Sequence, residues 1–337
     1  MKTGKLLGGI TSILLCVLIP LAVFSEGSFR QIEENGKIIE SVWEDSEGQA
    51  DNGPEGYASI RYTYKANNTY EAYYDTEGKP CRSLSGCYGR RVMKDGKGNI
   101  VEIEYLDENG SRMLNTRGYG MIVTSYFGFG PVRTVSYYGL GNRQIIVPSL
   151  GYASIIYDYS NKTMTSRTYR DEKGNPVDTA DGYAVIKQKL NKKFQVLSIR
   201  YDHADGTPAT GPDGWFRCVK DRDDKGRLVS VKYYDTEMQM TDRGAGYAWE
   251  GYEWQDDNTV MVTRYDLNDV PVADKAGVVT IVREMQDERI MKESFLDKDG
   301  NHVNNSQGVG AVTYSYDETG LTSMKYYDLT GNPVTTE

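Results

Sequence analysis

Histidines, the residues that most often act as general acids or bases, are rare in this chain. Only His203 and His302 occur among its 337 residues, each in a stretch rich in Asp and Gly. No G-x-S-x-G, P-loop or H-E-x-x-H motif is present. Carboxylates recur at regular intervals, which favours a place in repeated turns over a pair arranged for glycoside hydrolysis. The sequence therefore predicts a protein that is not an enzyme.

One acidic segment has the oxygen spacing that opens a calcium loop. Asp297, Asp299 and Asn301 place side-chain oxygens on alternate residues around Gly300. The distal bidentate Glu of a complete loop is missing, and Asp-x-x-Gly segments also form ordinary Asx turns. The Asx turn is the favoured interpretation. Asp297, Asp299 and Asn301 remain the candidate calcium ligands, and no other cofactor is expected.

Tryptophan and tyrosine rings are the candidate binding groups. The chain holds 27 Tyr against 7 Phe, and Trp215, Trp249 and Trp254 add larger rings. Such rings could stack on sugar rings; the alternative is that most of them are buried and form cross-strand pairs. Trp249 falls on the opposite face from Ala248, Tyr252 and Trp254, so it is the ring predicted to be most exposed.

The cysteines do not form a disulfide framework. Apart from Cys16, only Cys81, Cys87 and Cys218 are present, an odd number. Cys81 and Cys87 could pair across a turn-rich stretch, or all three could be free thiols. A structural zinc site has no support because no C-x-x-C motif occurs.

The N-terminus indicates export. Lys2 and Lys5 precede an apolar run over residues 6–24, and Val23 and Ser25 suit a cleavage site after Ser25. Residues 1–25 are predicted to be a signal peptide, with an uncleaved membrane anchor as the alternative. The protein is therefore expected to be secreted or at the cell surface. Contact with a membrane is expected only through this segment.

The charge of the chain argues against nucleic acid as a partner. The formal net charge is −9 at pH 7, and no basic stretch stands out in the sequence. Phosphate backbones are bound by clustered Lys and Arg, so an acidic chain of this kind is a poor candidate for them.

A repeat of about 32 residues organises the chain after residue 40. Two series of markers, an aromatic–Asp step and a Gly that most often precedes an aromatic ring, recur at spacings close to this period. The first series is Tyr74-Asp75, Leu106-Asp107, Tyr138-Gly139, Arg170-Asp171, Tyr201-Asp202, Tyr234-Asp235, Tyr265-Asp266, Leu296-Asp297 and Tyr327-Asp328. The second is Gly56, Gly86, Gly118, Gly151, Gly182, Gly214, Gly246, Gly277 and Gly308.

Each repeat is predicted to be a β-hairpin followed by a connector. In the unit that begins at Gly151, the two strands cover residues 151–157 and 163–169, and Asp171-x-x-Gly174 forms a turn. Proline follows this turn in several units, as at Pro176. Because proline lacks an N–H, strand pairing is expected to stop there.

The strands alternate in polarity, which predicts the fold class. Val101, Ile103 and Tyr105 share one face, while Glu102 and Glu104 share the other. So many apolar side chains cannot all face water, so the sheet must curl. The prediction is an all-β, elongated, open array of about nine antiparallel hairpins, coiled or solenoid-like, over residues 36–337. Residues 26–35 would form a short lead, and a closed propeller-like ring is the alternative fold.

These hairpins resemble the Tyr-Asp (RHS-type) repeats of bacteria and, more distantly, tryptophan-glycine and MORN-type repeats. The motifs that carry the resemblance are YDHADG at residues 201–206, YDETG at 316–320 and their equivalents between residues 40 and 337. The Tyr-Asp families have a shorter unit and an Arg-Leu after the Gly, which only Gly226-Arg227-Leu228 reproduces. The resemblance implies shells, wall attachment or ligand-binding rods, and rarely catalysis.

The expected function is therefore a non-catalytic binding module at the cell surface. The expected partner is a cell-wall or other glycan, or a surface protein, and the candidate contact residues are Trp215, Trp249 and Trp254. A structural spacer or protein-interaction rod is the alternative function.

Overall fold

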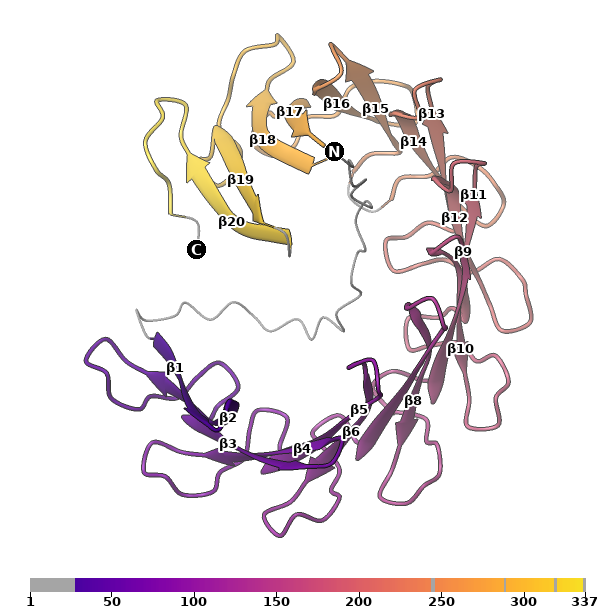
Figure 1. Ribbon diagram of the computed structural model, residues 1–337. Helices are drawn as coiled ribbons and strands as arrows, with labels where there is room; N and C mark the ends of the chain where they lie inside the picture. The colour runs from indigo at the N-terminus through magenta and orange to yellow at the C-terminus, as the bar shows by residue number, and fades with distance from the viewer. Residues whose placement is uncertain (1–27, 244–245, 288, 318–319, 336–337) are drawn as a thin grey trace, which may run out of the picture. The chain divides into compact units, whose positions relative to one another are not determined.

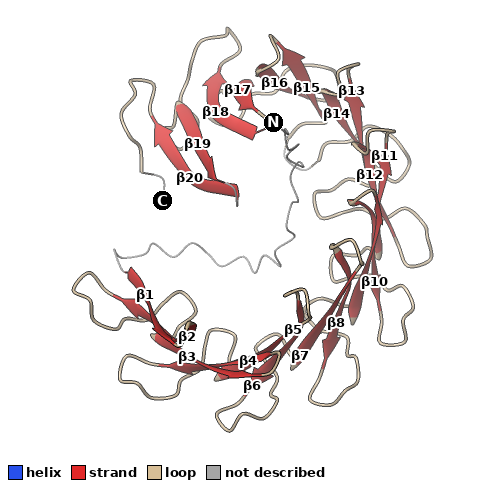
Figure 2. Ribbon diagram, in the orientation of Figure 1, coloured by secondary structure: helices blue, strands red, loops and turns tan. Residues whose placement is uncertain are grey.

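The computed structural model describes residues 28–243, 246–287, 289–317 and 320–335, and this part of the chain contains strands and loops but no helix (Figure 2). The predicted signal peptide or anchor at residues 1–25 lies outside the described residues. The chain forms two compact units. Among the described residues, one consists of residues 28–124 and 137–143, and the other of residues 125–136 and of those described between 144 and 335.

The described part of the chain contains twenty strands (Figure 1). In chain order they are β1 (Ser28–Glu34), β2 (Lys37–Glu44), β3 (Ser59–Lys65), β4 (Asn68–Tyr74), β5 (Gly89–Lys94), β6 (Ile100–Leu106), β7 (Met121–Tyr126), β8 (Val132–Tyr138), β9 (Ser154–Ser160), β10 (Thr163–Arg170), β11 (Val185–Leu190), β12 (Val196–Asp202), β13 (Arg217–Arg222), β14 (Leu228–Tyr234), β15 (Trp249–Trp254), β16 (Thr259–Tyr265), β17 (Thr280–Gln286), β18 (Arg289–Leu296), β19 (Ala311–Asp317) and β20 (Gly320–Tyr327).

The strands form antiparallel hairpins that also pair with the next hairpin in the chain. In the first unit, for example, β3 pairs with β4 within one hairpin, and β4 pairs with β5 of the next. In the second unit β11, β12 and β13 are joined in the same way. Propeller blades are separate sheets, so this pairing between hairpins does not fit the propeller alternative. The predicted all-β, open array of antiparallel hairpins is confirmed.

The first hairpin begins earlier than the repeat pattern indicates. Strand β1 lies in the segment predicted as a short lead, and it pairs with β2 across Asn35 and Gly36. Both turn residues have positive φ, 52° and 72°, as a two-residue Asn-Gly hairpin turn requires. With this hairpin the described strands make ten pairs, one more than the nine repeats predicted.

The Asp-x-x-Gly turn works as predicted, but the proline after it does not end the pairing. The carboxylate of Asp171 accepts the N–H groups of Lys173 and Asn175 at 2.9 and 2.8 Å, and Gly174 has a φ of 85°. Beyond the turn, Pro176 forms a β-bridge with Arg170, and the N–H of Val177 donates to the carbonyl of Tyr169 at 3.1 Å. Proline is tolerated because hydrogen bonds flank this bridge on either side and none requires its own N–H.

The sequence pattern places the start of one turn one residue too early. The sequence equates Tyr201-Asp202 with the other aromatic–Asp steps, but the turn begins at His203, whose N–H donates to the carbonyl of Thr207. The missing carboxylate is replaced only in part: Asp205 accepts the N–H of Thr207 at 2.9 Å, while Asp178 contacts His203 Nδ1 at 2.8 Å and accepts the N–H of Ala204 at 2.8 Å. Asp202 instead occupies the last position of β12 and forms a bridge with Pro208.

A ladder of aromatic rings forms the core of each unit. In the second unit seven rings follow one another at centroid distances of 4.7–6.3 Å, and none is more than 9% exposed. They are Tyr152, Tyr169, Tyr183, Tyr201, Trp215, Tyr233 and Tyr247. In the first unit Tyr57 stacks on Tyr73, and Tyr119 lies between Tyr105 and Tyr137.

The ladder alternates between a ring from the Gly-aromatic step of one hairpin and a ring from its second strand. Each internal ring therefore contacts one ring of its own hairpin and one ring of an adjacent hairpin, as Tyr183 does with Tyr201 and Tyr169. Aromatic pairs of this kind contribute about 0.5–1.5 kcal/mol each beyond the area they bury. Near the C-terminus, Val278, Phe295 and Val309 form an aliphatic and aromatic cluster in the same sequence positions.

Candidate binding surface

The buried ladder contains 11 of the 27 tyrosines and Trp215, so candidate binding groups are the remaining rings and the charged side chains. Trp215 belongs to the ladder and is 6% exposed. Its binding role stays a prediction, although a ring so buried has little surface left for a ligand.

Trp254 is partly exposed but holds neighbouring hairpins together. Its Nε1–H donates to the carbonyl of Leu228 at 2.9 Å, and the guanidinium of Arg227 lies 4.9 Å from its ring.

The same contact recurs elsewhere with the same spacing of 26 residues. Tyr64 donates to the carbonyl of Ile38 at 2.8 Å, and Tyr316 donates to that of Ile290 at 2.9 Å. We call this repeated contact, from the end of a first strand to the preceding hairpin, the hairpin staple. Its recurrence marks a structural role for Trp254.

Trp249 has the placement that suits a ligand best among the three tryptophans. It begins β15 on the face opposite the ladder and is partly exposed. Its ring lies parallel to that of Tyr265, with centroids 4.0 Å apart, and its Nε1–H donates to Asp269 at 2.9 Å. The ammonium of Lys232 lies 5.8 Å from the ring centroid. The Trp249 ring thus lies between Tyr265 on one side and the Lys232 cation on the other, and we call the Trp249–Tyr265 pair the aromatic platform.

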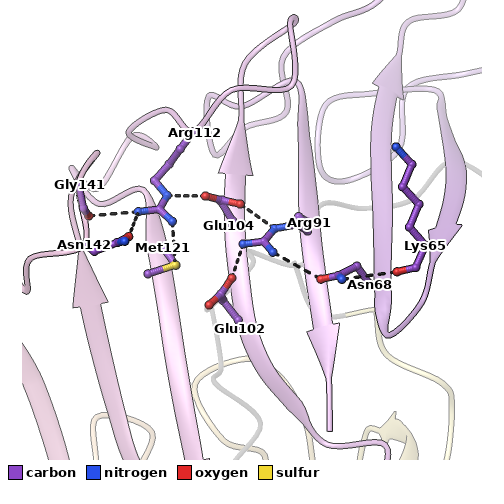
Figure 3. Close-up of polar contacts among 9 residues, drawn as sticks. All are labelled: Lys65, Asn68, Arg91, Glu102, Glu104, Arg112, Met121, Gly141 and Asn142. Atoms are coloured by element: carbon purple, nitrogen blue, oxygen red, sulfur yellow. Dashed lines mark hydrogen bonds and ion pairs between the residues drawn. The ribbon is translucent and has the colours of Figure 1, made fainter.

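A network of ion pairs occupies the corresponding polar face of the first unit (Figure 3). Glu104 lies between Arg91 and Arg112, with contacts of 2.7 and 2.5 Å, and Arg91 also contacts Glu102. These four side chains are only 13–23% exposed. Two cations are matched by two anions, so the network leaves no net charge to offer a ligand.

Arg112 is a residue that sequence reasoning missed. It takes the bridge position that proline occupies in other repeats, opposite Leu106. From there its guanidinium reaches the carbonyl of Gly141 at 3.1 Å and the side chain of Asn142 at 3.2 Å (Figure 3). The absence of proline at this step of the repeat was the available signal. These contacts indicate a structural role, because they join two consecutive connectors.

In the second unit a row of cations crosses three adjacent strands. Lys187 on β11 lies opposite Arg200 on β12, and Arg200 lies opposite Arg217 on β13. Asp202, which is 2% exposed, contacts Lys187 Nζ at 2.9 Å and Arg200 at 3.3 Å. We call Lys187, Arg200 and Arg217 the cationic row. It was not visible in the sequence because its members are separated by 13 and 17 residues and meet only through the strand register.

The candidate calcium residues form an Asx turn. Asp297 accepts the N–H groups of Asp299 and Asn301 at 2.8 and 2.9 Å, and Lys298 pairs with Asp299 at 2.8 Å. The hydrogen bonds from Asn301 and Asp299 lower the pKa of the Asp297 carboxyl. Over the described ranges, no group of three or more His, Cys, Asp or Glu side chains is placed to hold a metal ion.

The cysteines and His302 were the other residues considered for chemistry. Cys81, Cys87 and Cys218 are free thiols, and Cys87 and Cys218 are buried. His302 is exposed and forms the bridge with Leu296 that proline forms elsewhere. Within the part of the chain that the structure describes, no helix could span a membrane.

The fold and these contacts define a β-hairpin repeat protein. No family model matches the chain, and no curated protein matches it. Among solved structures, it is similar to a crystal structure of TcdB2-TccC3-Cdc42, at 11% identity and a TM-score of 0.30, over 92% of this chain and 16% of that one. It is also similar to TcdB2-TccC3 without its hypervariable C-terminal region, at 10% identity and a TM-score of 0.22, over 92% of this chain and 22% of that one.

The chain thus spans less than a quarter of either matched chain.

Proposed function

We propose that this chain is an exported, non-catalytic module that binds a glycan through the polar face of its second unit. The observation that carries the proposal is the Trp249–Tyr265 platform, which lies on the face opposite the buried ladder. A flat aromatic surface held by an Asp269 hydrogen bond loses little conformational freedom when a sugar ring stacks on it.

Glycan binding can be tested with purified protein on insoluble cell walls and on a glycan array. We expect saturable binding that Trp249→Ala weakens by at least tenfold. Phe129→Ala is the matched control, because Phe129 is another exposed ring of the same unit, 51% accessible at a hairpin turn. Equal loss in both variants, or no saturable binding by the parent chain, would contradict the proposal.

Export rests on the composition of residues 1–25 and can be tested separately. The full chain, expressed in a bacterial host, is expected outside the cytoplasm, with a mature N-terminus at Glu26. Mass spectrometry of the recovered protein distinguishes this cleavage from an uncleaved anchor. Retention of the whole chain in the cytoplasm would contradict export.

A structural spacer is the second candidate function. The observation that favours it is the recurrence of the hairpin staple and of the ladder, which join consecutive hairpins in both units. A spacer would show the same stability as a binding module but no saturable glycan binding, so the experiment on cell walls separates the two.

A further inference from the structure

Cross-strand neighbours in this protein are usually of opposite charge where both are charged. On the polar face of the first unit, Arg61 lies opposite Glu40 with a contact of 3.0 Å, and Arg91 lies opposite Glu104 with a contact of 2.7 Å. Opposite charges in such positions stabilise a sheet, whereas like charges directly opposite one another destabilise it.

The cationic row departs from this arrangement. Lys187, Arg200 and Arg217 are consecutive cross-strand neighbours, and all three carry a positive charge. Lys187 and Arg200 are close to half exposed, at 47% and 45% of their side-chain surface. Three cations held side by side repel one another, so the row has a cost in stability that the fold itself does not require.

The described carboxylates compensate only part of this charge. Asp202 contacts Lys187 and Arg200, and its burial fixes it between them. The Nε of Arg217 is buried and has no hydrogen-bond partner among the described residues. One carboxylate facing three cations leaves an excess of positive charge, in a chain whose net charge is −9.

The row lies next to the aromatic platform. Arg217 is opposite Tyr234 on β14, and Lys232, two residues before Tyr234, is opposite Trp249 on β15. Neighbouring strands are about 4.8 Å apart, so the row and the platform span a few sugar units of an extended chain.

We propose that the cationic row binds the anionic groups of an acidic polysaccharide, while an adjoining sugar stacks on Trp249. This inference rests on the proposed glycan-binding function and names its ligand class. Guanidinium groups suit carboxylate and sulfate oxygens because they donate two parallel hydrogen bonds to them. Asp202 acts as a positioning residue, since it holds Lys187 and Arg200 in the row and contacts no ligand in this scheme.

The test compares glycans that differ in charge. Hyaluronan hexamers carry carboxylates only, chondroitin sulfate adds sulfates, and chitohexaose is neutral and of the same length as the hyaluronan probe. We expect titration calorimetry to show binding of an acidic glycan at least tenfold tighter than that of chitohexaose, and weakening as salt rises. The two acidic probes show whether carboxylate or sulfate is preferred.

Substitutions in the cationic row test whether the row binds the acidic glycan. Arg200→Gln and Arg217→Gln are each expected to weaken binding of the acidic glycan by about tenfold, as loss of a charged hydrogen bond implies. Lys292→Gln is the matched control, because Lys292 is also a strand cation but is paired with Glu284 at 2.9 Å. Arg217→Gln is expected to melt no lower than the parent chain, since it relieves repulsion in the row while Lys187 and Arg200 keep their contacts with Asp202; a purely structural arginine would lower the melting temperature.

Each remaining outcome is decisive. Equal binding of acidic and neutral glycans, unaffected by Arg200→Gln, would overturn the acidic ligand and leave glycan binding in place. No binding of any glycan would overturn both proposals. Binding of single-stranded DNA in preference to every glycan would show that the row serves a different polyanion, and would also overturn the inference.

Discussion

Trp249 and Trp254 are in the same strand, but their roles differ. Trp254 ends β15 and donates its Nε1–H to a carbonyl of the preceding hairpin. Trp249 begins β15 on the opposite face and stacks on Tyr265. A ring at the end of a first strand can donate to a backbone carbonyl of the hairpin before it, whereas Trp249, at the start and on the polar face, contacts only side chains in the described part of the chain, those of Tyr265, Asp269 and Lys232. Position along the hairpin therefore decides whether a ring serves folding or is free for a ligand.

The hairpin staple predicts a specific loss in Tyr316→Phe. The ring is retained, but the carbonyl of Ile290 loses its donor, which costs about 1–2 kcal/mol for a partly buried group. Thermal and urea unfolding should both show this destabilisation. Tyr326→Phe is the control, since its hydroxyl lies 3.8 Å from the Met324 sulfur, a weak contact. If the two variants unfold alike, the staple does not stabilise the array.

The sequence predicted the positions of the tryptophan rings more accurately than their structural roles. Alternation placed Trp249 on the polar face, and the repeat placed Trp215 at the Gly-aromatic step, where the structure has a ladder ring. The partners of these rings lie 14 to 26 residues away, so local pattern could not show which ring is buried and which is stapled. Asp202 is the clearest case. Its type matched the turn consensus, but the turn geometry placed His203 there instead.

At the scale of the element, the connector after each second strand begins with a turn. A short segment after the turn then pairs with the end of that same strand. The bridge between Arg170 and Pro176 is flanked by hydrogen bonds from Asp171 and Val177, and proline fits because its position donates none of them. The repeat showed where proline recurs but not the direction of the neighbouring N–H groups, because that depends on the register of the returning segment.

Moving the proline by one residue tests this arrangement. Pro176→Ala should lower stability by no more than about 1 kcal/mol, because it mainly increases the freedom of the unfolded chain. Val177→Pro should cost more than that, since it removes the N–H that donates to the carbonyl of Tyr169. Urea unfolding of the two variants gives the comparison, and a smaller effect at residue 177 than at 176 would contradict the assigned pairing.

The aromatic ladder predicts how stability depends on alkaline pH. Burial raises the pKa of Tyr201 to about 12, and it also raises the pKa of Tyr169 and Tyr233 above their ordinary value of 10. The neutral phenol is thus favoured in the folded chain. This contribution to stability is fully present below pH 10, the unfolded value, and is lost as the pH rises through the folded values.

The melting temperature should therefore fall steeply between pH 10 and about pH 12, together with a rise in tyrosinate absorbance. Tyr201→Phe keeps the ring in the ladder but removes one titrating group, so its melting temperature should fall less over the same interval. An identical fall in the parent and the variant would show that Tyr201 does not contribute to the alkaline transition.

At the scale of the whole molecule, each hairpin depends on its neighbours. Internal second strands such as β10 bond to a strand on either side, and the ring of the following hairpin packs on theirs, as Tyr183 does on Tyr169. Repeat arrays of this kind gain stability from these interfaces as well as from each hairpin itself. A strand that lacks one interface should therefore open at a lower free energy than the rest.

Within the part of the chain that the structure describes, strand β20 is such a strand: it pairs only with β19, and Leu321 and Met324 are 51% and 46% exposed. Tyr326 and Val334 line an open hollow at the position where a following ring would pack in an internal hairpin. Hydrogen exchange followed by mass spectrometry should show faster exchange for β20 amides that bond to β19 than for the matching amides of β10. Protection of β20 equal to that of β10, in dilute protein, would mean that the stability of a hairpin does not depend on the one that follows it.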